Sequence, residues 1–581
     1  MAHRPRMTYC NPLNLAYRFQ VPNPKVACRR EAADPSVIAY RGRYWLFASK
    51  SGGYWFSDDL LEWTFVATDK LPTEDYAPDV RVINDWVYFT ASRHNPECPV
   101  FRSQALEEDQ WELVGERLIY WDPNMFQDDD GRVYLYYGSS NKDPLYGLEL
   151  DPETMGPNSD TVQVIQNHQQ TEHGWERYGV NNATMDPPWL EGAWMTKHGG
   201  RYYLQYAAAG TEFDVYADGV YIGDAPLGPF GYAEHNPFSL KPGGFIGGAG
   251  HGSTFQDRHG NWWHTSTMCV SVHHKFERRL GLWPAGFDED GVLFCNTRFG
   301  DYPTRVHDGP FDPWADSFGG WMLLSYRKPV TVSSAVPGRP GECIADESVR
   351  TWWAAADGDS TPSISVDLEA RPEIRAVQIN FAEDQCEQYC RAGDPLFHRY
   401  VLEASEDGET WFPLADKRER SEDVPHDYLE FDTGVCARYV RLTIHHMPGQ
   451  GRPAVRGLRI FGRADGDPPS APANLDVSRN PDDPCQVRLS WPGIPAADGY
   501  NIRWGIAADK LYSDWLVYDQ TELRMNCLTA GQEYVFAIEA FNASGVSPLS
   551  AAVRSRSANA PFANSANSSA RSVPVYDRSP R

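Results

Sequence analysis

Short runs in which hydrophobic and polar residues alternate recur along most of the chain. Five of these runs share one layout: a turn of Gly, Asn or Asp, then alternating aromatic residues, then small or hydroxyl residues. They occupy residues 41–49 (RGRYWLFAS), 83–92 (INDWVYFTAS), 130–139 (DGRVYLYYGS), 199–208 (GGRYYLQYAA) and 259–267 (HGNWWHTST). Gly and Asn supply the positive φ of a tight hairpin, and the aromatic run fits its returning strand. Spacings of roughly 40 to 70 residues are typical of propeller blades, so the sequence predicts a five-bladed β-propeller over residues 8–310.

Two further β patterns follow the predicted propeller. The first begins near Trp321 and includes 345–355 (ADESVRTWWAA), and the second follows a Pro-rich linker (GDPPSAPANLDVS). We therefore expect an all-β chain: a five-bladed β-propeller followed by two β-sandwich domains, over residues 321–463 and 467–555. Residues 556–581 are rich in Ser, Ala, Asn and Arg with little to bury, and we expect a disordered tail there.

Composition and charge narrow the partners. A net charge of −26 and a pI near 5.0, with no basic stripe, argue against nucleic acid. No apolar run is long enough to cross a membrane, so we do not expect a membrane as a partner. The N-terminus has no apolar segment typical of a signal peptide, which predicts a cytoplasmic protein, or a secreted one if the start is mis-assigned. The eleven cysteines are scattered, with only Cys386 and Cys390 close together, and we interpret them as free thiols in a reducing compartment.

An ionisable residue precedes the turn of every predicted blade. Counting back from the turns reaches Asp34, Asp122, Glu191 and His251 at eight or nine residues, and Asp79 at five in a shorter hairpin. The innermost strands of a propeller converge on its axis, so we expect these groups to face one another across one mouth of the central channel. Unpaired charges at close quarters are costly, which favours a functional cluster over a structural one.

Several other residues have two interpretations. The DDDG turn at 128–131 fits hairpin chemistry better than a calcium loop, because later ligands at EF-hand spacing are missing. Trp189 and Trp194 flank Glu191 as blade core or as a sugar platform, and we interpret His264 as structural. His173, Glu176 and Arg177 lie between two blades, where they either contact a substrate or form an ordinary surface loop.

Three carboxylates around one pocket suit glycosidic bond cleavage. One must be ionised to take a proton from water, and another must stay protonated to give its proton to the leaving oxygen. A third acid nearby raises the pKa of the proton donor by like-charge repulsion. Asp34, Glu191 and Asp122 can fill these three roles.

The motifs around these acids resemble glycoside hydrolase family 43, five-bladed propeller enzymes that act mainly on xylosides and arabinosides. ADPS at 33–36, WDPNMFQDDDGRVYLYYGSS and LEGAWMTKHGGRYYLQYAAAG are similar to the segments of the family's general base, pKa modulator and general acid. The resemblance thus implies Asp34 as base, Asp122 as modulator and Glu191 as acid. It also implies single-step inversion, which requires base and acid carboxyl groups about 6.5–9.5 Å apart.

The same resemblance extends to substrate-binding residues. GAGHGSTFQDRHGNWWHTST is similar to the segment whose histidine lies at the channel centre, which places His251 there, near a structural calcium ion held through water. Arg278 or Arg279 of ERRLGLWPAGFDEDGVLF would reach the sugar, and Tyr76 with Asp79 would line the second blade. Family members often have Trp where Tyr76 stands, so the substrate preference of those members does not transfer directly. No redox cofactor is implied.

The two following domains resemble known sandwiches. Residues 321–463 resemble a discoidin, or coagulation factor 5/8 type C, module, which would bind sugar or support the propeller. Residues 467–555 resemble a fibronectin type III domain, usually a spacer or contact surface.

The sequence thus predicts an inverting exo-glycosidase that releases a terminal pentose, as β-xyloside or α-L-arabinofuranoside, from plant-type oligo- or polysaccharides. The alternatives are the same fold acting on a β-galactoside or galactofuranoside, and a non-catalytic carbohydrate-binding propeller.

Overall fold

The computed structural model describes residues 7–20, 28–92, 98–118, 120–386 and 396–557. Strands and irregular segments make up nearly all of this part of the chain, and its helical segments are the short 3₁₀ turns η1 (Gly174–Glu176), η2 (Val180–Asn182), η3 (Gly341–Ala345) and η5 (Pro448–Gln450). No helix in the described ranges has the length and apolar character needed to cross a membrane. The predicted all-β fold class is confirmed.

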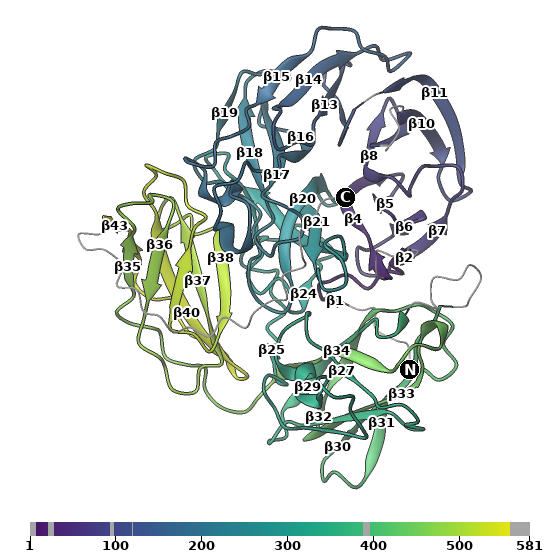
Figure 1. The fold of residues 1–581 in the computed structure, drawn as a ribbon, viewed down its shortest axis with the longest axis vertical. Helices are drawn as coiled ribbons and strands as arrows, with labels where there is room; N and C mark the ends of the chain where they lie inside the picture. Colours follow the sequence, from purple (N-terminus) through teal and green to yellow (C-terminus); the bar gives the residue numbers. More distant parts are fainter. Residues whose placement is uncertain (1–6, 21–27, 93–97, 119, 387–395, 558–581) are drawn as a thin grey trace.

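Five four-stranded antiparallel sheets follow one another along the first half of the chain and form the blades (Figure 1). Their strands, from the axis outward, are β4 (Ala33–Tyr40), β5 (Arg43–Ser49), β6 (Gly53–Ser57) and β7 (Thr64–Ala67); β8 (Tyr76–Ile83), β9 (Trp86–Ser92), β10 (Cys98–Ala105) and β11 (Gln110–Leu118); β12 (Asn124–Gln127), β13 (Val133–Tyr137), β14 (Leu145–Leu150) and β15 (Val162–Ile165); β16 (Glu191–His198), β17 (Arg201–Ala208), β18 (Ala217–Gly223) and β19 (Phe230–Tyr232); β20 (Gly247–Gln256), β21 (Trp262–Cys269), β22 (Arg278–Phe287) and β23 (Leu293–Cys295). The inner strands β4, β8, β12, β16 and β20 contact one another in turn, and β20 contacts β4. The ring is therefore closed.

The aromatic runs found in the sequence are the second strands of the blades. In each of these strands, side chains alternate between the two faces of a blade and pack against both neighbouring blades. The hairpin interpretation of residues 128–131 is also confirmed, because the Gly131 N–H donates to the Asp128 carbonyl at 2.9 Å. Short ribbons outside the blades, β1 (Thr8–Tyr9) with β24 (Thr304–Arg305) and β2 (Arg18–Gln20) with β3 (Arg29–Glu31), complete the propeller.

Two β-sandwiches flank the propeller. The second domain packs a sheet of β25 (Met322–Leu323), β34 (Ala454–Arg463), β29 (Glu373–Phe381), β32 (His426–Cys436) and β27 (Trp353–Ala354) on a sheet of β26 (Val330–Val332), β28 (Ser363–Asp367), β33 (Tyr439–His446), β30 (Arg399–Ser405) and β31 (Trp411–Asp416). The third domain packs β39 (Glu522–Met525), β36 (Val487–Ser490), β35 (Asp476–Arg479) and β43 (Arg556–Ser557) on β38 (Ser513–Tyr518), β37 (Gly499–Gly505), β40 (Val535–Asn542), β41 (Gly545–Val546) and β42 (Val553–Arg554). Because β43 pairs with β35, the third sandwich continues two residues into the predicted tail; residues 558–581 lie outside the described part.

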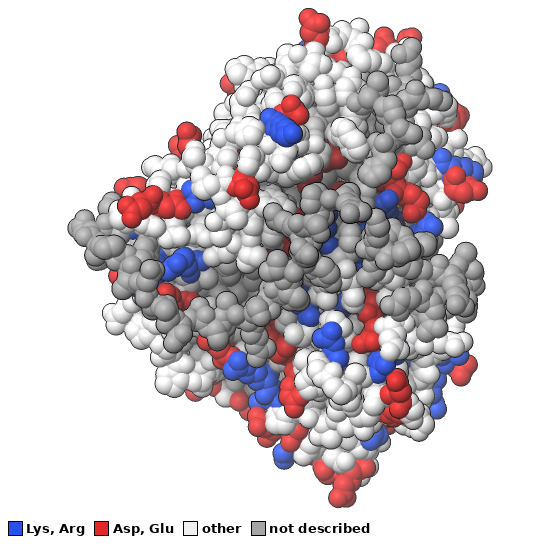
Figure 2. All heavy atoms as spheres, in the orientation of Figure 1, with Lys and Arg blue, Asp and Glu red and all other residues white. Residues whose placement is uncertain are grey.

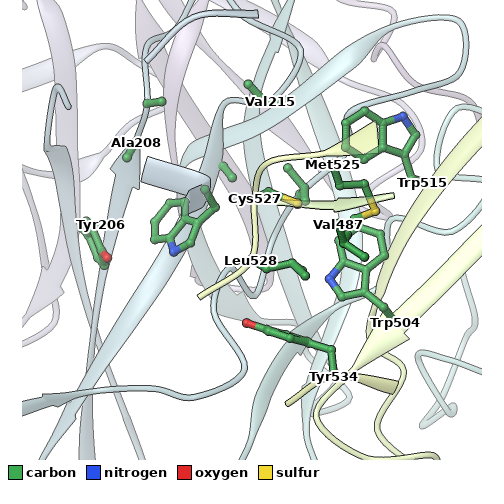
Figure 3. Close-up of a cluster of buried hydrophobic side chains, with 14 of the residues drawn as sticks. Tyr206, Ala208, Val215, Val487, Trp504, Trp515, Met525, Cys527, Leu528 and Tyr534 are labelled. Atoms are coloured by element: carbon green, nitrogen blue, oxygen red, sulfur yellow. The ribbon is translucent and has the colours of Figure 1, made fainter. Parts of the chain in front are cut away.

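The third domain shares a hydrophobic core with the propeller. Tyr206 and Ala208 of β17 and Trp175 of η1 belong to the same buried cluster as Trp504 and Leu528 of the third domain (Figure 3). A second cluster joins all three domains: it contains Phe299 of the propeller, Phe461 of the second domain and Phe541 of the third. The third domain is therefore packed on the propeller rather than held away from it as a spacer.

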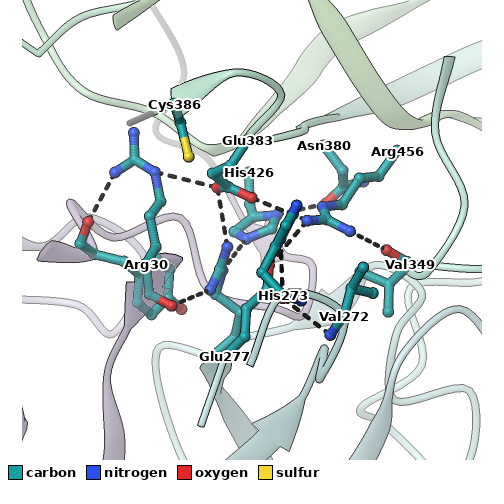
Figure 4. Close-up of polar contacts among 12 residues, drawn as sticks. Arg30, Val272, His273, Glu277, Val349, Asn380, Glu383, Cys386, His426 and Arg456 are labelled. Carbon is teal, nitrogen blue, oxygen red and sulfur yellow. Dashed lines mark hydrogen bonds and ion pairs between the residues drawn. The ribbon is translucent and has the colours of Figure 1, made fainter. Parts of the chain in front are cut away.

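A buried charge network joins the second domain to the propeller (Figure 4). Glu383 accepts from Arg279 at 3.1 Å, pairs with Arg30 at 3.2 Å and accepts from Arg456 at 3.1 Å, and Arg456 also donates to Glu277 at 2.9 Å. These side chains are at most 3% exposed. Such a network is stable only when every charge has a partner, so it fixes the orientation of the two domains.

The charge on the surface is mixed, and the cysteines correct one of the expectations. On the face seen in Figure 2, Lys and Arg side chains lie singly or in small groups among Asp and Glu, with no broad basic patch. Eight cysteines of the described ranges are free thiols, but Cys28 is disulfide-bonded, so the interpretation of all cysteines as free was wrong.

Candidate active site

The inner strands begin with the same local irregularity. In β4, three residue steps from Ala33 to Ser36 are paired with two steps from Ser49 to Phe47, and β8, β16 and β20 show the same one-residue bulge. The residue inside the bulge, or at the same place before β12, has a left-handed backbone: φ is 52° at Asp34, 49° at Ala77, 48° at Asp122, 66° at Gly192 and 49° at His251. A bulge bends a strand and re-aims its side chains, which here brings Asp34, Asp122 and His251 to the axis.

The bulge position corrects the expected phase of the ionisable residues. Ala77, not Asp79, takes this position in the second blade, and Asp79 follows two residues later. Glu191 stands immediately before the bulge position, which Gly192 occupies. The shorter hairpin expected in the second blade was wrong: β4–β5 and β8–β9 are both joined by two-residue turns, and counting eight residues back from Asp85, as from Gly42 to Asp34, reaches Ala77.

A ring of hydrogen bonds joins neighbouring inner strands just beyond the bulges. Backbone N–H groups of Val37, Val80, Met125 and Met195 donate to side-chain oxygens of Ser253, Ser36, Asp79 and Asn124, at 3.1, 3.0, 2.7 and 2.8 Å respectively. Between the fourth and fifth blades, the Trp194 indole N–H donates to the Thr254 carbonyl at 3.0 Å. This ring holds the five blades in register around the axis.

Asp79 belongs to this ring and not to the group of acids in the mouth. Its second oxygen accepts from the Asn124 amide at 2.8 Å, and its side chain is 2% exposed. Burial raises the pKa of Asp79 to about 6. The side chain bridges two blades and also lines the axial cavity, so its contact with substrate stays a prediction.

Asp34, Asp122, Glu191 and His251 do converge. His251 Nδ1 lies 3.4 Å from Asp34 Oδ1 and 3.9 Å from Asp122 Oδ2. One ligand atom from each of Asp122, Glu191 and His251 lies within 4.8 Å of the others. A small axial cavity has Asp34, Asp122 and His251 in its wall.

Asp34 is held as a carboxylate. Its Oδ2 accepts from the Ser49 hydroxyl at 2.6 Å, and its Oδ1 accepts from Arg278 Nη1 at 3.2 Å. Burial acts to raise the pKa of Asp34, but the charges of Arg278 and His251 outweigh it, and the pKa falls below its ordinary value. An ionised, hydrogen-bonded carboxylate can accept a proton from water.

Glu191 has the opposite character. Burial, and after it the charge of Asp122, raise the pKa of Glu191 to about 7. Its Oε1 accepts from the Tyr216 hydroxyl at 2.5 Å, and its Oε2 accepts from the Ser139 hydroxyl at 3.1 Å. Burial also raises the pKa of Asp122, and the Asp34 carboxylate adds to the effect while His251 opposes it. Two carboxyl groups whose pKa values are pushed apart are the usual mark of an acid and base pair.

His251 is fixed from behind by a buried aspartate. The backbone N–H groups of His251 and Gly252 donate to the two oxygens of Asp218, at 2.6 and 2.9 Å. His264, fully buried, contacts the same carboxylate at 3.0 Å, which agrees with its interpretation as structural. Burial acts to lower the pKa of His251, but Asp34, Asp122 and Glu191 together raise it above the ordinary value.

The two arginines of the ERR segment lie on opposite faces of β22. Arg278 reaches the site, where it pairs with Asp34 and donates to Glu31 at 2.9 Å. Arg279 is fully buried against the second domain, where it donates to His426 at 2.8 Å and to Glu383. The prediction of Arg279 as a sugar contact was therefore wrong.

Tyr76 forms one wall near the base. Its ring lies 5.7 Å from that of Phe276, and the Arg278 guanidinium lies 5.7 Å from the Tyr76 ring centre. Burial raises the pKa of Tyr76 to about 12, so its hydroxyl stays protonated at neutral pH. The pair of rings encloses the Asp34 side of the mouth with aromatic surface.

The tryptophans near Glu191 differ from each other, and the 173–177 segment is buried. Trp194 is 4% exposed and belongs to the core, whereas Trp189 is 40% exposed.

His173 stacks on Tyr232 at 3.8 Å, and Arg177 donates to Asp483 of the third domain at 2.6 and 2.9 Å. The segment is thus neither a substrate contact nor a surface loop.

Direct calcium binding does not fit these residues. Calcium takes about six to eight oxygen ligands, whereas the described cluster offers two carboxyl groups and an imidazole nitrogen. One of those carboxyls, Glu191, has a pKa of about 7, so a large share of it is protonated and uncharged at neutral pH. A calcium ion held through water remains a prediction.

The sequence reasoning missed the hydroxyl groups that support the site, and Tyr216 and Asp218. Ser49, Ser92 and Thr267 accept from the backbone N–H groups of Ala77, Asp122 and Asp34, at 2.7, 2.6 and 2.8 Å. Ser49 and Ser92 end the second strands of their blades, and Thr267 lies two residues before the end of the second strand in the fifth blade. The shared small or hydroxyl endings of the aromatic runs were the signal for them.

Comparison with known proteins agrees with this architecture. Residues 23–293 match the model of glycosyl hydrolases family 43, and residues 329–457 match the F5/8 type C domain. The chain therefore contains a family 43 glycoside hydrolase domain followed by a discoidin-type domain. The fibronectin type III assignment of the third sandwich stays a prediction.

Three curated relatives are similar to parts of this chain. A β-D-galactofuranosidase of Aspergillus niger is 24% identical over 234 residues, covering 34% of this chain and 62% of its own length. An arabinoxylan arabinofuranohydrolase of Paenibacillus polymyxa is 32% identical over 163 residues, covering 26% of this chain and 23% of its own length. A β-xylosidase of Xylanibacter ruminicola is 26% identical over 196 residues, covering 30% of this chain and 56% of its own length. The chain spans less than two thirds of the length of each.

Proposed function

We propose that this protein is an inverting exo-glycoside hydrolase that releases a terminal pentose, a β-xyloside or an α-L-arabinofuranoside, from plant-type oligo- or polysaccharides. Asp34 would be the general base, Glu191 the general acid and Asp122 the modulator of the acid. The observation that carries this proposal is the split between the lowered pKa of Asp34 and the pKa of about 7 at Glu191 within one axial cluster. A base must be ionised and an acid protonated at the same pH, and this split meets both needs.

The reaction follows from these states. Asp34 removes a proton from a water molecule whose oxygen forms a bond to the anomeric carbon. The bond to the leaving oxygen breaks as Glu191 transfers its proton to that oxygen. Arg278 keeps Asp34 ionised before the step, and the Asp122 charge keeps Glu191 loaded. Proton exchange with solvent then restores both carboxyl groups.

Two alternatives differ in what they require. Galactofuranosides are the second candidate substrate, because one relative is a β-D-galactofuranosidase. Galactofuranosides and arabinofuranosides both contain a furanose ring. A non-catalytic sugar-binding propeller would need hydrogen-bond partners, but it would not need two carboxyl groups with opposite pKa shifts. The acid trio favours the enzyme.

Hydrolysis of a panel of aryl glycosides tests the proposal: β-xyloside, α-arabinofuranoside, β-galactoside and β-galactofuranoside, each with wild type and Glu191→Ala. We expect the wild type to hydrolyse one of the two pentosides and Glu191→Ala to hydrolyse the same pentoside more slowly. Release of a product whose anomeric configuration is inverted, followed by NMR, supports the single-step mechanism, and retention refutes it. Internal cleavage of a polymer would refute exo action.

A further inference from the structure

Two tryptophans stand apart from the other eighteen. All twenty lie in the described part of the chain, and only Trp121 and Trp189 are exposed by more than a third of their surface, at 47% and 40%. Trp121 directly precedes Asp122, and Trp189 precedes Glu191 by two residues. Singly exposed hydrophobic side chains are ordinary, but exposed aromatic side chains grouped beside a pocket mark a binding surface, and these two stand beside two of the three acids.

Both tryptophans are anchored to one short segment at the end of β13. The Trp189 indole N–H donates to the Ser139 hydroxyl at 2.9 Å, and that hydroxyl donates to Glu191 Oε2 at 3.1 Å. The Trp121 carbonyl accepts from the Gly138 N–H at 2.8 Å. Both residues therefore lie beside the same segment, on the Glu191 side of the mouth, while Tyr76 and Phe276 lie on the Asp34 side.

The third domain stiffens the segment that leads to Trp189. Arg177 makes its two-pronged pair with Asp483, and the Asn526 amide donates to the Asn181 carbonyl at 2.7 Å. The Gly174 N–H donates to the Leu528 carbonyl at 3.0 Å. A platform held in place before binding loses little conformational entropy when a ligand docks on it.

We propose that Trp121 and Trp189 form a platform for the leaving group, and that the leaving group is a pyranose unit of an oligo- or polysaccharide chain. This inference rests on the proposed function. An acid must reach the leaving oxygen, so the leaving sugar lies over the Glu191 rim. The flat C–H face of a pyranose suits the face of an indole ring, and its hydroxyls stay in water.

The test compares two substrates that share the released sugar: its glycosyl fluoride, whose leaving group occupies no sugar platform, and an oligosaccharide that ends in it. We expect Trp121→Ala and Trp189→Ala to lower kcat/KM on the oligosaccharide by about tenfold to a hundredfold, and to lower it much less on the fluoride. Trp189→Phe keeps a ring and loses the N–H, so it should retain more oligosaccharide activity than Trp189→Ala. Trp411→Ala in the second domain is the matched control, with no effect on either substrate.

The outcomes separate this inference from the proposed function. Equal losses on both substrates, or no loss on the oligosaccharide, would overturn the platform while leaving the hydrolase intact. A loss in Trp189→Ala alone would also overturn it, because only Trp189 is linked to Glu191 through Ser139. If wild type cleaves neither substrate for any sugar in the panel, the proposed function falls and the platform with it.

Discussion

Arg456→Met should destabilise the protein far more than an ordinary arginine substitution. Arg456 is 1% exposed, and its guanidinium donates to Glu277 at 2.9 Å, to Glu383 at 3.1 Å and to the Val349 carbonyl at 2.8 Å. Methionine fills similar volume but leaves two buried carboxylates short of positive charge. Removing one member of a buried ion pair costs about 3–5 kcal/mol, and we expect a loss of that size in the free energy of unfolding.

The same substitution should also slow hydrolysis. Glu277 accepts from the backbone N–H groups of Val272 and His273, at 3.0 and 2.7 Å, and so shapes the loop that carries Phe276 and leads to Arg278. Small misplacements of groups around a reacting centre can cost about a hundredfold in rate. We expect at least a tenfold lower kcat/KM for Arg456→Met at a temperature where it is fully folded, with partial recovery in Arg456→Lys.

Guanidinium unfolding followed by tryptophan fluorescence measures the first effect, and initial rates on the best aryl glycoside measure the second. Arg441→Met is the matched control in the same domain: Arg441 pairs with Glu403 at 2.8 Å, but both side chains are partly exposed. It should cost less than about 1 kcal/mol and leave the rate unchanged. Equal effects of the two substitutions would refute the view that this network supports the active site.

Three further predictions concern the carboxyl cluster. Because Glu191 must be protonated, kcat/KM should fall as the pH rises through about 7. Asp122→Asn removes a negative neighbour, so it should lower the pKa of Glu191 and move this alkaline limb of the kcat/KM profile to lower pH. An alkaline limb that does not move would contradict the modulator role of Asp122. Tyr216→Phe removes a hydrogen bond that favours ionised Glu191, so the same limb should move to higher pH, as a pH–rate profile would show. A chelator such as EDTA should leave initial rates unchanged, because the described cluster does not suit direct calcium binding; a loss that calcium restores would contradict this and support the calcium ion held through water.

The sequence was sufficient for the blades and for most of the acid cluster, because both depend on local patterns. Alternating aromatics and turn residues repeat in each blade, and Asp34, Asp122 and His251 occur eight or nine residues before the Gly of their turns. The pattern could not separate Arg278 from Arg279: successive strand residues point to opposite faces, and strand register decides which face meets the cavity. Nor could it reveal the burial of Arg177, whose partner Asp483 lies some three hundred residues away and meets it only in the folded chain.

The accessory domains each support a different side of the reaction centre. The second domain holds the loop that leads to Arg278, beside the base, and the third holds the segment that leads to Trp189, beside the acid. A propeller cut free near residue 310 would leave the carboxylate of Glu277 and the guanidinium groups of Arg30 and Arg279 without their partners in the second domain. The domains are therefore poor candidates for exchange as independent modules, and selection acting on catalysis would also constrain residues of both sandwiches far from any sugar.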